Sequence, residues 1–154
     1  MTTSICIAQL NFVVGDINAN AQKILAAAAQ AHAQGAKLLL TPELALCGYA
    51  AEDLLLRPSF QQACAQALQS IVEASVQWPD LMLLVGHPHA DEPQSRQSLN
   101  CASWIQNGRV LTRYAKHALP NCGVFDELRY FASSAAPCVV DVGGLKAGVL
   151  ICED

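Results

Sequence analysis

Glu43, Lys116 and Cys152 each stand within three residues of the end of a short apolar run, and together they could hydrolyse an amide. A cysteine attacks a carbonyl only as a thiolate, and a free thiol, with a pKa of about 8.5, is mostly protonated at neutral pH. It therefore needs a base or a cation nearby. A carboxylate can take the proton, and an ammonium can stabilise the negative charge that develops on the carbonyl oxygen.

The three apolar runs must be strands if they are to bring these side chains together. Open α/β sheets bind their ligands at the carboxyl ends of the strands, and all three residues follow such predicted ends. The alternative for Lys116 is an ordinary solvated loop lysine, because lysines are rarely buried without a partner. The stretch Tyr114 to Phe131, which reads YAKHALPNCGVFDELRYF, contains Lys116 and more chemically capable side chains than any other of its length.

Three ordered motifs carry a family resemblance. The segments TPELALCGY (41–49) and VLICED (149–154), taken with Lys116, resemble the Glu-Lys-Cys triad of the nitrilase superfamily of carbon-nitrogen hydrolases. The phrases LPN and VFDELRYF are especially similar to the glutaminase domains of glutamine-dependent NAD synthetases, and GYAAEDLLLRPSF (48–60) looks like the same subfamily. The resemblance spans essentially the whole chain. It implies an α/β fold, a nitrilase-like four-layer α-β-β-α sandwich.

The resemblance also implies a mechanism. Glu43 takes the proton of Cys152, and the thiolate attacks the side-chain amide of glutamine. Lys116, with the backbone N–H that follows Cys152, stabilises the oxyanion. Ammonia leaves, and a water activated by Glu43 hydrolyses the thioester to release glutamate.

The same resemblance gives expectations for Glu127, Glu153 and Cys122, and the neighbouring charges give one for Arg129. Glu127 corresponds to a supporting glutamate that orients the lysine and the nucleophile, with an ordinary surface acid as the alternative. Glu153 matches a position that helps receive the substrate's ammonium group. Cys122 stands in the glutamine pocket where the subfamily usually has tyrosine, so it places substrate affinity in doubt. Arg129 is expected to pair with a neighbouring acid, Asp126 or Glu127.

The domain expectation is that residues 1–154 form the N-terminal portion of a carbon-nitrogen hydrolase domain, truncated after the strand that carries the nucleophile. No SGGxDS-like run occurs, so the synthetase (ATP pyrophosphatase) domain is expected to be absent. ATP, Mg and deamido-NAD are then expected only at that domain, with no cofactor in this chain. The expected partners are glutamine, the synthetase domain and further copies of the protein. Uncovered apolar sheet surface is expected to make the isolated chain self-associate, with little activity.

Composition excludes several other classes. The 154 residues are 53% hydrophobic and only 14% charged, with a formal charge of −4 and no basic cluster, which argues against nucleic acid. The amino terminus is expected to be a first strand rather than a signal peptide, and no apolar run of membrane-spanning length occurs. Seven cysteines without a CxxC pair favour free thiols in a reducing cytoplasm.

Other interpretations stay open. A stand-alone amidase or carbamoylase of the same superfamily is the alternative within enzymes, and a non-catalytic assembly domain is the alternative outside them. His87 and His89 are spaced as metal ligands could be, but no further ligand set accompanies them, so we expect no metal.

Periodicity predicts the elements that position these residues. A buried strand is expected at 4–12, then a helix that Asn18 or Asn20 caps and Gly35 ends, and a parallel strand at 37–40. A second helix is expected at 60–76 with Ser59 as its cap. Further strands are expected at 81–86, 99–106, 109–114, 138–142 and 146–151. The pair Asn107-Gly108 predicts a hairpin turn between the strands at 99–106 and 109–114. Residues 48–58 are expected to be irregular or a short helical turn, and 91–97 to form a loop.

Overall fold

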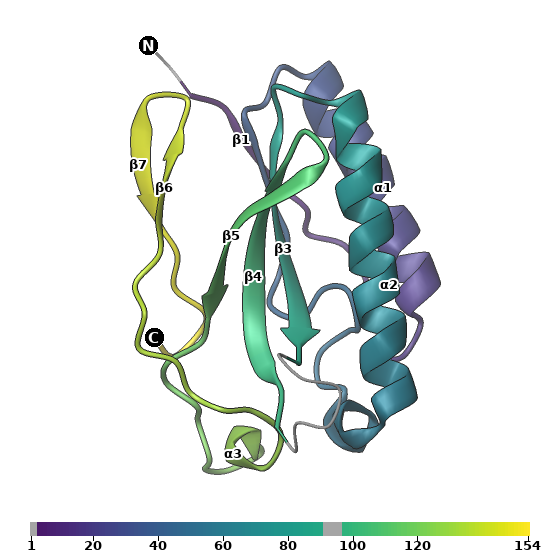
Figure 1. Cartoon of the computed structure of the whole chain (residues 1–154), viewed down its shortest axis with the longest axis vertical. Helices are drawn as coiled ribbons and strands as arrows, with labels where there is room; N and C mark the ends of the chain where they lie inside the picture. Colours follow the sequence, from purple (N-terminus) through teal and green to yellow (C-terminus); the bar gives the residue numbers. More distant parts are fainter. Residues whose placement is uncertain (1–2, 91–96) are drawn as a thin grey trace.

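A five-stranded sheet lies between a layer of two helices and a small hairpin in the computed structural model, which describes residues 3–90 and 97–154 (Figure 1). In chain order the elements are β1 (Ile5–Ile7), α1 (Ile17–Ala33), β2 (Leu38–Leu40), the 3₁₀ helix η1 (Glu52–Leu56), α2 (Pro58–Ala74), the 3₁₀ helix η2 (Ser75–Gln77), β3 (Met82–His89), β4 (Leu99–Gln106), β5 (Arg109–Ala115), α3 (Glu127–Tyr130), β6 (Val139–Val142) and β7 (Leu145–Gly148). The hairpin β6–β7 is a separate two-stranded sheet. The chain thus forms part of the expected α-β-β-α arrangement.

The sheet order β1-β2-β3-β4-β5 explains how distant segments meet. Strands β1, β2 and β3 are parallel, whereas β4 is antiparallel to both of its neighbours, β3 and β5. Hence β5 runs in the same direction as β2. The carboxyl ends of β2 and β5 and the beginning of β4 therefore share one edge of the sheet, which is the edge that the sequence predicts for the site.

A register shift in the hairpin β4–β5 decides which face Lys116 occupies. Near the turn Ile105 pairs with Val110, but beyond the shift Trp104 pairs with Thr112, so β5 has one extra residue. Such a β-bulge exchanges the two faces of the strand beyond it. Without the bulge, Lys116 would lie on the same face as Ile105, beneath the helices. With it, Lys116 lies on the opposite face.

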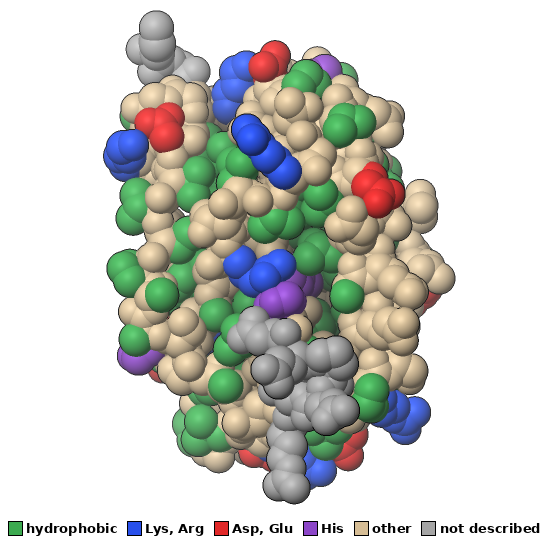
Figure 2. All heavy atoms as spheres, viewed as in Figure 1, with side chains coloured by type: hydrophobic (Ala, Val, Ile, Leu, Met, Phe, Trp, Pro, Cys, Tyr) green, Lys and Arg blue, Asp and Glu red, His purple; other side chains and the backbone are tan. Residues whose placement is uncertain are grey.

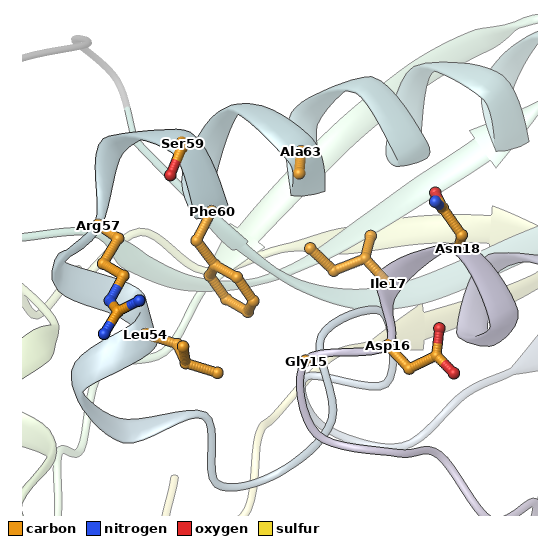
Figure 3. Close-up of a pocket in the computed structure, with 9 residues that line it drawn as sticks. All are labelled: Gly15, Asp16, Ile17, Asn18, Leu54, Arg57, Ser59, Phe60 and Ala63. Carbon is orange, nitrogen blue, oxygen red and sulfur yellow. The ribbon is translucent and has the colours of Figure 1, made fainter.

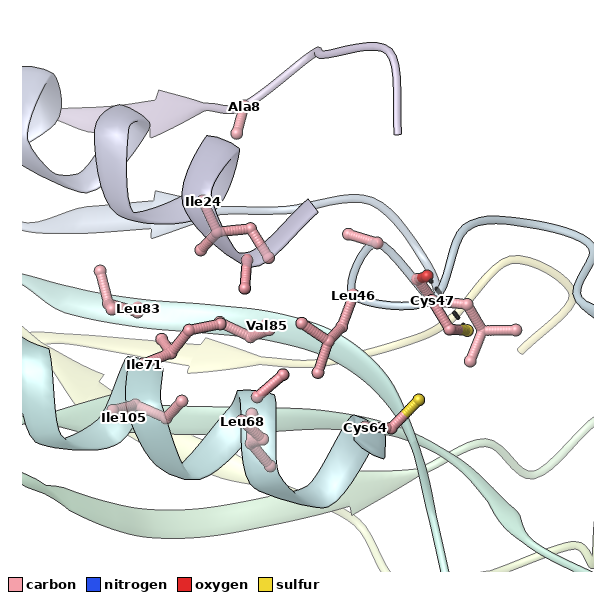
Figure 4. Close-up of a cluster of buried hydrophobic side chains, with 14 of the residues drawn as sticks. Ala8, Ile24, Leu46, Cys47, Cys64, Leu68, Ile71, Leu83, Val85 and Ile105 are labelled. Carbon is pink, nitrogen blue, oxygen red and sulfur yellow. Dashed lines mark hydrogen bonds between the residues drawn. The ribbon is translucent and has the colours of Figure 1, made fainter. Parts of the chain in front are cut away.

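Helices α1 and α2 cover one face of the sheet because each presents an apolar stripe to it. Figure 4 shows this core, in which Ile24 of α1, Ile71 of α2 and Leu83 of β3 are fully buried. A second cluster occupies the other face, where Trp104 of β4 packs with Ile151 and with residues of the hairpin β6–β7. The sheet therefore has two covered faces, and the candidate site residues lie on the face away from the helices.

Both helices begin earlier than predicted. The cap of α1 is Asp16, whose carboxylate accepts a hydrogen bond from Ala19 N at 3.3 Å, so the expectation of Asn18 or Asn20 was wrong. The reason is that Asn20 is buried and bonds instead to the backbone of Val13 and Leu46. Helix α2 starts at Pro58, which needs no amide partner at the first helical position, so Ser59 is not the cap.

Two predicted strands are shorter than the sequence suggests. The first covers only Ile5–Ile7, and Ile5 and Ile7 are exposed rather than buried, because β1 is the edge of the sheet and the helices cover only its other face. The last ends at Gly148, so residues 149–151 lie outside the strand. The strands predicted at 37–40, 99–106 and 109–114 are confirmed as β2, β4 and β5. The predicted loop at 91–97 lies largely outside the described residues.

Large apolar side chains remain exposed on this side of the molecule, as Figure 2 shows between the hairpin and the sheet. Val139 of β6 is 63% exposed, and Leu145 of β7 and Leu150 are similarly open. These side chains form exposed apolar surface. Over residues 3–90 and 97–154, no helix has both the length and the apolar character to cross a membrane.

Candidate active site

Lys116 is the centre of a buried ionic cluster. Its ammonium, which is fully buried, donates to Glu43 Oε1 and to Glu127 Oε1, each at 2.9 Å. Burial alone would lower the pKa of Lys116, but the hydrogen bonds to the two carboxylates outweigh it and raise that pKa. The solvated-loop interpretation is therefore wrong for this lysine, which stays protonated at neutral pH.

Glu43 reaches the cluster because its loop lies directly against strand β3. Gly86 of β3 has no side chain, and a Cβ there would contact the carbonyl of Pro42 and lie 2.7 Å from Leu44 N. The Thr41 hydroxyl also accepts a hydrogen bond from Gly86 N at 3.0 Å. Because these two backbones lie so close together, the loop that carries Glu43 has a fixed position beyond the end of β2.

Asn100 is a second donor to Glu43, and sequence reasoning did not single it out. It lies at the start of β4, where its Nδ2 donates to Glu43 Oε1 at 2.6 Å and its carbonyl accepts from Lys116 N at 2.8 Å. The side chain is buried, and its Oδ1 has no hydrogen-bond partner among the described residues. Only the bulged register of the hairpin reveals that Asn100 stands opposite Lys116.

Cys152 is exposed and lines a hollow that Glu43 also lines, together with Gly86 and Ala102 of the sheet. Its backbone has a φ of 53°, a left-handed conformation that a non-glycine residue rarely adopts and that is found at functional turns. Burial raises the pKa of the Cys152 thiol, the charge of Glu43 raises it further and Lys116 opposes both. No hydrogen bond joins this thiol to Glu43 or Lys116 among the described residues.

Asp154 ties the turn at Cys152 to the end of β5. One carboxylate oxygen accepts from the backbone N–H groups of His117 and Ala118, and the other accepts from Ile151 N and from the Tyr114 hydroxyl. Burial would raise the pKa of Asp154, but these hydrogen bonds outweigh it and lower that pKa. This anchor, which sequence reasoning also missed, holds the Cys152 turn beside the strand that leads to Lys116.

Glu127 is buried at the start of α3, so the surface-acid alternative was wrong. Burial raises its pKa, and Lys116 opposes that shift. Its Oε2 has no hydrogen-bond partner among the described residues. Arg129 pairs with Asp53 of η1 at 3.0 Å, not with Asp126 or Glu127, because α3 turns its side chain toward η1.

Cys122 and Glu153, the two expected substrate-binding residues, are both exposed. Neither side chain forms a hydrogen bond or ion pair with Glu43, Lys116 or Cys152 among the described residues. Glu153 follows Cys152 directly, and its charge contributes to the raised pKa of that thiol. The geometry therefore brings together Glu43, Lys116 and Glu127 with Cys152 beside them, and it leaves Cys122 apart.

Protein groups contact the ring nitrogens of His87 and one ring nitrogen of His89. Both ring nitrogens of His87 are engaged, with the Pro88 carbonyl at 2.9 Å and the Ser103 hydroxyl at 2.7 Å, and His89 lies 2.9 Å from an Arg113 nitrogen. Burial lowers the pKa of His87 to about 3, so it is neutral. The described residues contain no group of three or more His, Cys, Asp or Glu arranged to hold a metal.

A separate hollow lies at the amino-terminal ends of α1 and α2 (Figure 3). Asp16, Asn18, Arg57 and Phe60 are among the residues that line it. It contains none of the candidate catalytic residues, so it is distinct from the site at Cys152.

The α/β fold is shared with solved proteins that include glutamine-dependent NAD+ synthetases and amidases. The sequence model of the family described as carbon-nitrogen hydrolase matches residues 4–154. This chain belongs to the carbon-nitrogen hydrolase family. This match confirms the enzymatic class expected from the resemblance, that of a carbon-nitrogen hydrolase.

The named relatives are considerably longer than this chain. The glutamine-dependent NAD(+) synthetase of Synechocystis sp. is 45% identical over an alignment of 155 positions, which covers 98% of this chain and 27% of that protein. The solved glutamine-dependent NAD+ synthetase of Acinetobacter baumannii superposes with a TM-score of 0.88 at 39% identity, over 100% of this chain and 28% of the other. The chain thus spans about a quarter of the length of these relatives.

A second group of similar structures consists of smaller enzymes. A solved amidase from Nesterenkonia sp. AN1 superposes with a TM-score of 0.81 at 27% identity, over 99% of this chain and 56% of the amidase. That structure carries the acetamide moiety of fluoroacetamide bound covalently at the active site cysteine. The fold is therefore that of the nitrilase superfamily, of which this chain supplies a part.

Proposed function

We propose that this chain is the glutaminase part of a glutamine-dependent NAD synthetase and that Cys152 is its nucleophile. Glu43 takes the thiol proton, the Cys152 sulfur bonds to the amide carbon of glutamine, and the carbon-nitrogen bond breaks as the proton passes to the leaving nitrogen. Ammonia departs. A water that gives its proton to Glu43 then hydrolyses the thioester and releases glutamate with the free thiol.

The observation that supports this role most strongly is the buried Lys116 ammonium between two carboxylates beside a cysteine. An ammonium has three N–H donors, and only two of them are used by Glu43 and Glu127. The third can donate to the oxyanion. The raised pKa of Cys152 keeps the resting group a thiol, which explains why the mechanism requires Glu43 as a base.

Two lines of support select glutamine. The relatives at 38–45% identity carry the name glutamine-dependent NAD(+) synthetase, and the LPN and VFDELRYF phrases are similar to that subfamily. In this proposal ammonia passes to a synthetase domain, where ATP, Mg and deamido-NAD are used. Glu153 and the Cys122 loop would contribute to the glutamine pocket, and the protein would assemble as a homo-oligomer.

A stand-alone amidase is the second candidate, because the Nesterenkonia enzyme shares the fold over 99% of this chain. The two candidates differ in whether amide hydrolysis is linked to ATP-dependent NAD formation. Amide hydrolysis by the full-length protein without any glutamine-driven NAD formation would select the amidase.

The test of the synthetase role is Cys152→Ala in the full-length protein, with NAD formation measured from glutamine and from ammonium. We expect glutamine-driven formation to fall more than about a hundredfold while ammonium-driven formation is retained, because only the ammonia source is lost. Cys6→Ala, a half-buried thiol of β1, is the matched control and should retain both. Equal loss of both activities in a folded Cys152→Ala protein would contradict the proposal.

A further inference from the structure

The strongest unassigned feature is the buried amide of Asn100 on Glu43. Its Nδ2 donates to Glu43 Oε1 at 2.6 Å, and Lys116 Nζ donates to the same oxygen at 2.9 Å. Both donors thus meet on one oxygen of the carboxylate. No described residue donates a hydrogen bond to Glu43 Oε2, so that oxygen keeps its lone pairs for another proton.

The amide is not explained by stability. Its Oδ1 is buried without a hydrogen-bond partner among the described residues, and such an unpaired acceptor costs free energy. An apolar side chain of similar size would carry no such cost. An amide that is retained in spite of this cost is expected where the donor has a functional role.

The position of Asn100 depends on the same hairpin that carries Lys116. The bulge between Trp104 and Ile105 brings Asn100 opposite Lys116, and the two backbones are joined by the bond from Lys116 N to the Asn100 carbonyl. The two donors are therefore held by adjacent strands of one sheet. Rotation of the Glu43 carboxylate would have to break a hydrogen bond from each.

We propose that Asn100 is a positioning residue, which together with Lys116 holds Glu43 by Oε1 so that Oε2 is the atom that takes the proton of Cys152. The inference rests on the proposed function, since it assigns the base of that reaction to a particular oxygen. Asn100 does not touch the substrate in this proposal and acts only through Glu43.

The test is a double-mutant cycle on the alkylation rate of Cys152 in the full-length protein. The variants are Asn100→Ala, Glu43→Gln and the double substitution. Iodoacetamide is the probe, and peptide mass mapping separates the label on Cys152 from that on the exposed Cys122, which reports unchanged reagent reactivity. The readout needs no turnover, so it remains measurable when Glu43 is replaced.

We expect Asn100→Ala to slow Cys152 alkylation about tenfold when Glu43 is present, because a hydrogen bond to a charged group is lost. The same substitution should change the rate less than about twofold in the Glu43→Gln background. Turnover by Asn100→Ala should fall in kcat with KM nearly unchanged, since substrate binding is not altered. Asn20→Ala is the control, because among the described residues the Asn20 amide bonds to backbone groups only. This substitution should change the Cys152 alkylation rate by the same factor with Glu43 present and in the Glu43→Gln background.

Two other outcomes would overturn one claim each. Suppose that Glu43→Gln slows Cys152 alkylation. If Asn100→Ala then has no effect, or slows alkylation equally with and without Glu43, the positioning role of Asn100 is wrong while the proposed function stands. If Glu43→Gln leaves glutamine hydrolysis unchanged, Glu43 is not the base and the proposed function itself fails.

Discussion

One ammonium and two carboxylates share a buried space beside the Cys152 thiol. Lys116 has no solvent-exposed surface, and the side chain of Glu43 is only 17% exposed. With all three groups ionised, the cluster carries one net negative charge, and this disfavours a second anion on the neighbouring sulfur. The raised pKa of Cys152 follows from burial and this charge. In the proposed mechanism, this arrangement keeps Cys152 protonated until it attacks a substrate.

Lys116→Met is expected to unfold or strongly destabilise the protein as well as abolish hydrolysis. It leaves Glu43 and Glu127 without their common partner, and removing one member of a buried ion pair costs about 3–5 kcal/mol. Lys146→Met is the matched control, because Lys146 is 76% exposed and, among the residues that the structure describes, pairs only with the exposed Asp141. Urea unfolding and glutamate release measure the two effects. Equal stability of both variants would show that the buried pairs are not needed for folding.

At the scale of single elements, the sequence predicts which strands carry the site but not which way their side chains face. The hairpin at Asn107-Gly108 was predicted from its turn, and both of its strands are confirmed. The bulge was not predicted, because no residue of β5 marks it. Since the bulge exchanges the faces of the strand, periodicity alone would have placed Lys116 beneath the helices.

Asn100 and Asp154 escaped prediction for a related reason. Asn100 gains its role from the strand opposite it, and Asp154 gains its role from backbone groups at 117 and 118. Neither contact lies within a local sequence pattern. Glu43, Lys116 and Cys152 could be selected from the sequence because each follows an apolar run and matches a family motif.

Gly86→Ala is expected to displace the loop that carries Glu43. The added Cβ would collide with the backbone of Pro42 and Leu44, which is not a flexible neighbour. Overpacking of this kind costs about 1–3 kcal/mol, and a shift of the loop would lower kcat more than the loss of stability implies. Gly148→Ala is the control, since nothing lies within 4 Å of the position that its Cβ would take. Thermal unfolding and kcat should separate the two variants, and identical kcat values would count against a precise fit at Gly86.

At the scale of the whole molecule, the two faces of the sheet have different roles. The helix side is a continuous apolar core that gives the sheet its rigidity. The other side carries the ionic cluster, the Cys152 turn and exposed apolar residues such as Leu150. A site on the rigid sheet edge keeps its groups in fixed positions, which is what preorganised charge stabilisation requires.

The central claim is that Cys152 attacks the amide of glutamine with the help of Glu43 and Lys116. It is tested most directly by treating the full-length protein with a chloroketone analogue of glutamine and mapping the labelled peptide by mass spectrometry. We predict one label per chain, on Cys152, with a loss of glutaminase activity in proportion to this labelling. Glutamine and the substitution Glu43→Gln should each slow the labelling. Loss of activity with the label on the exposed Cys122, or with Cys152 unmodified, would contradict the account.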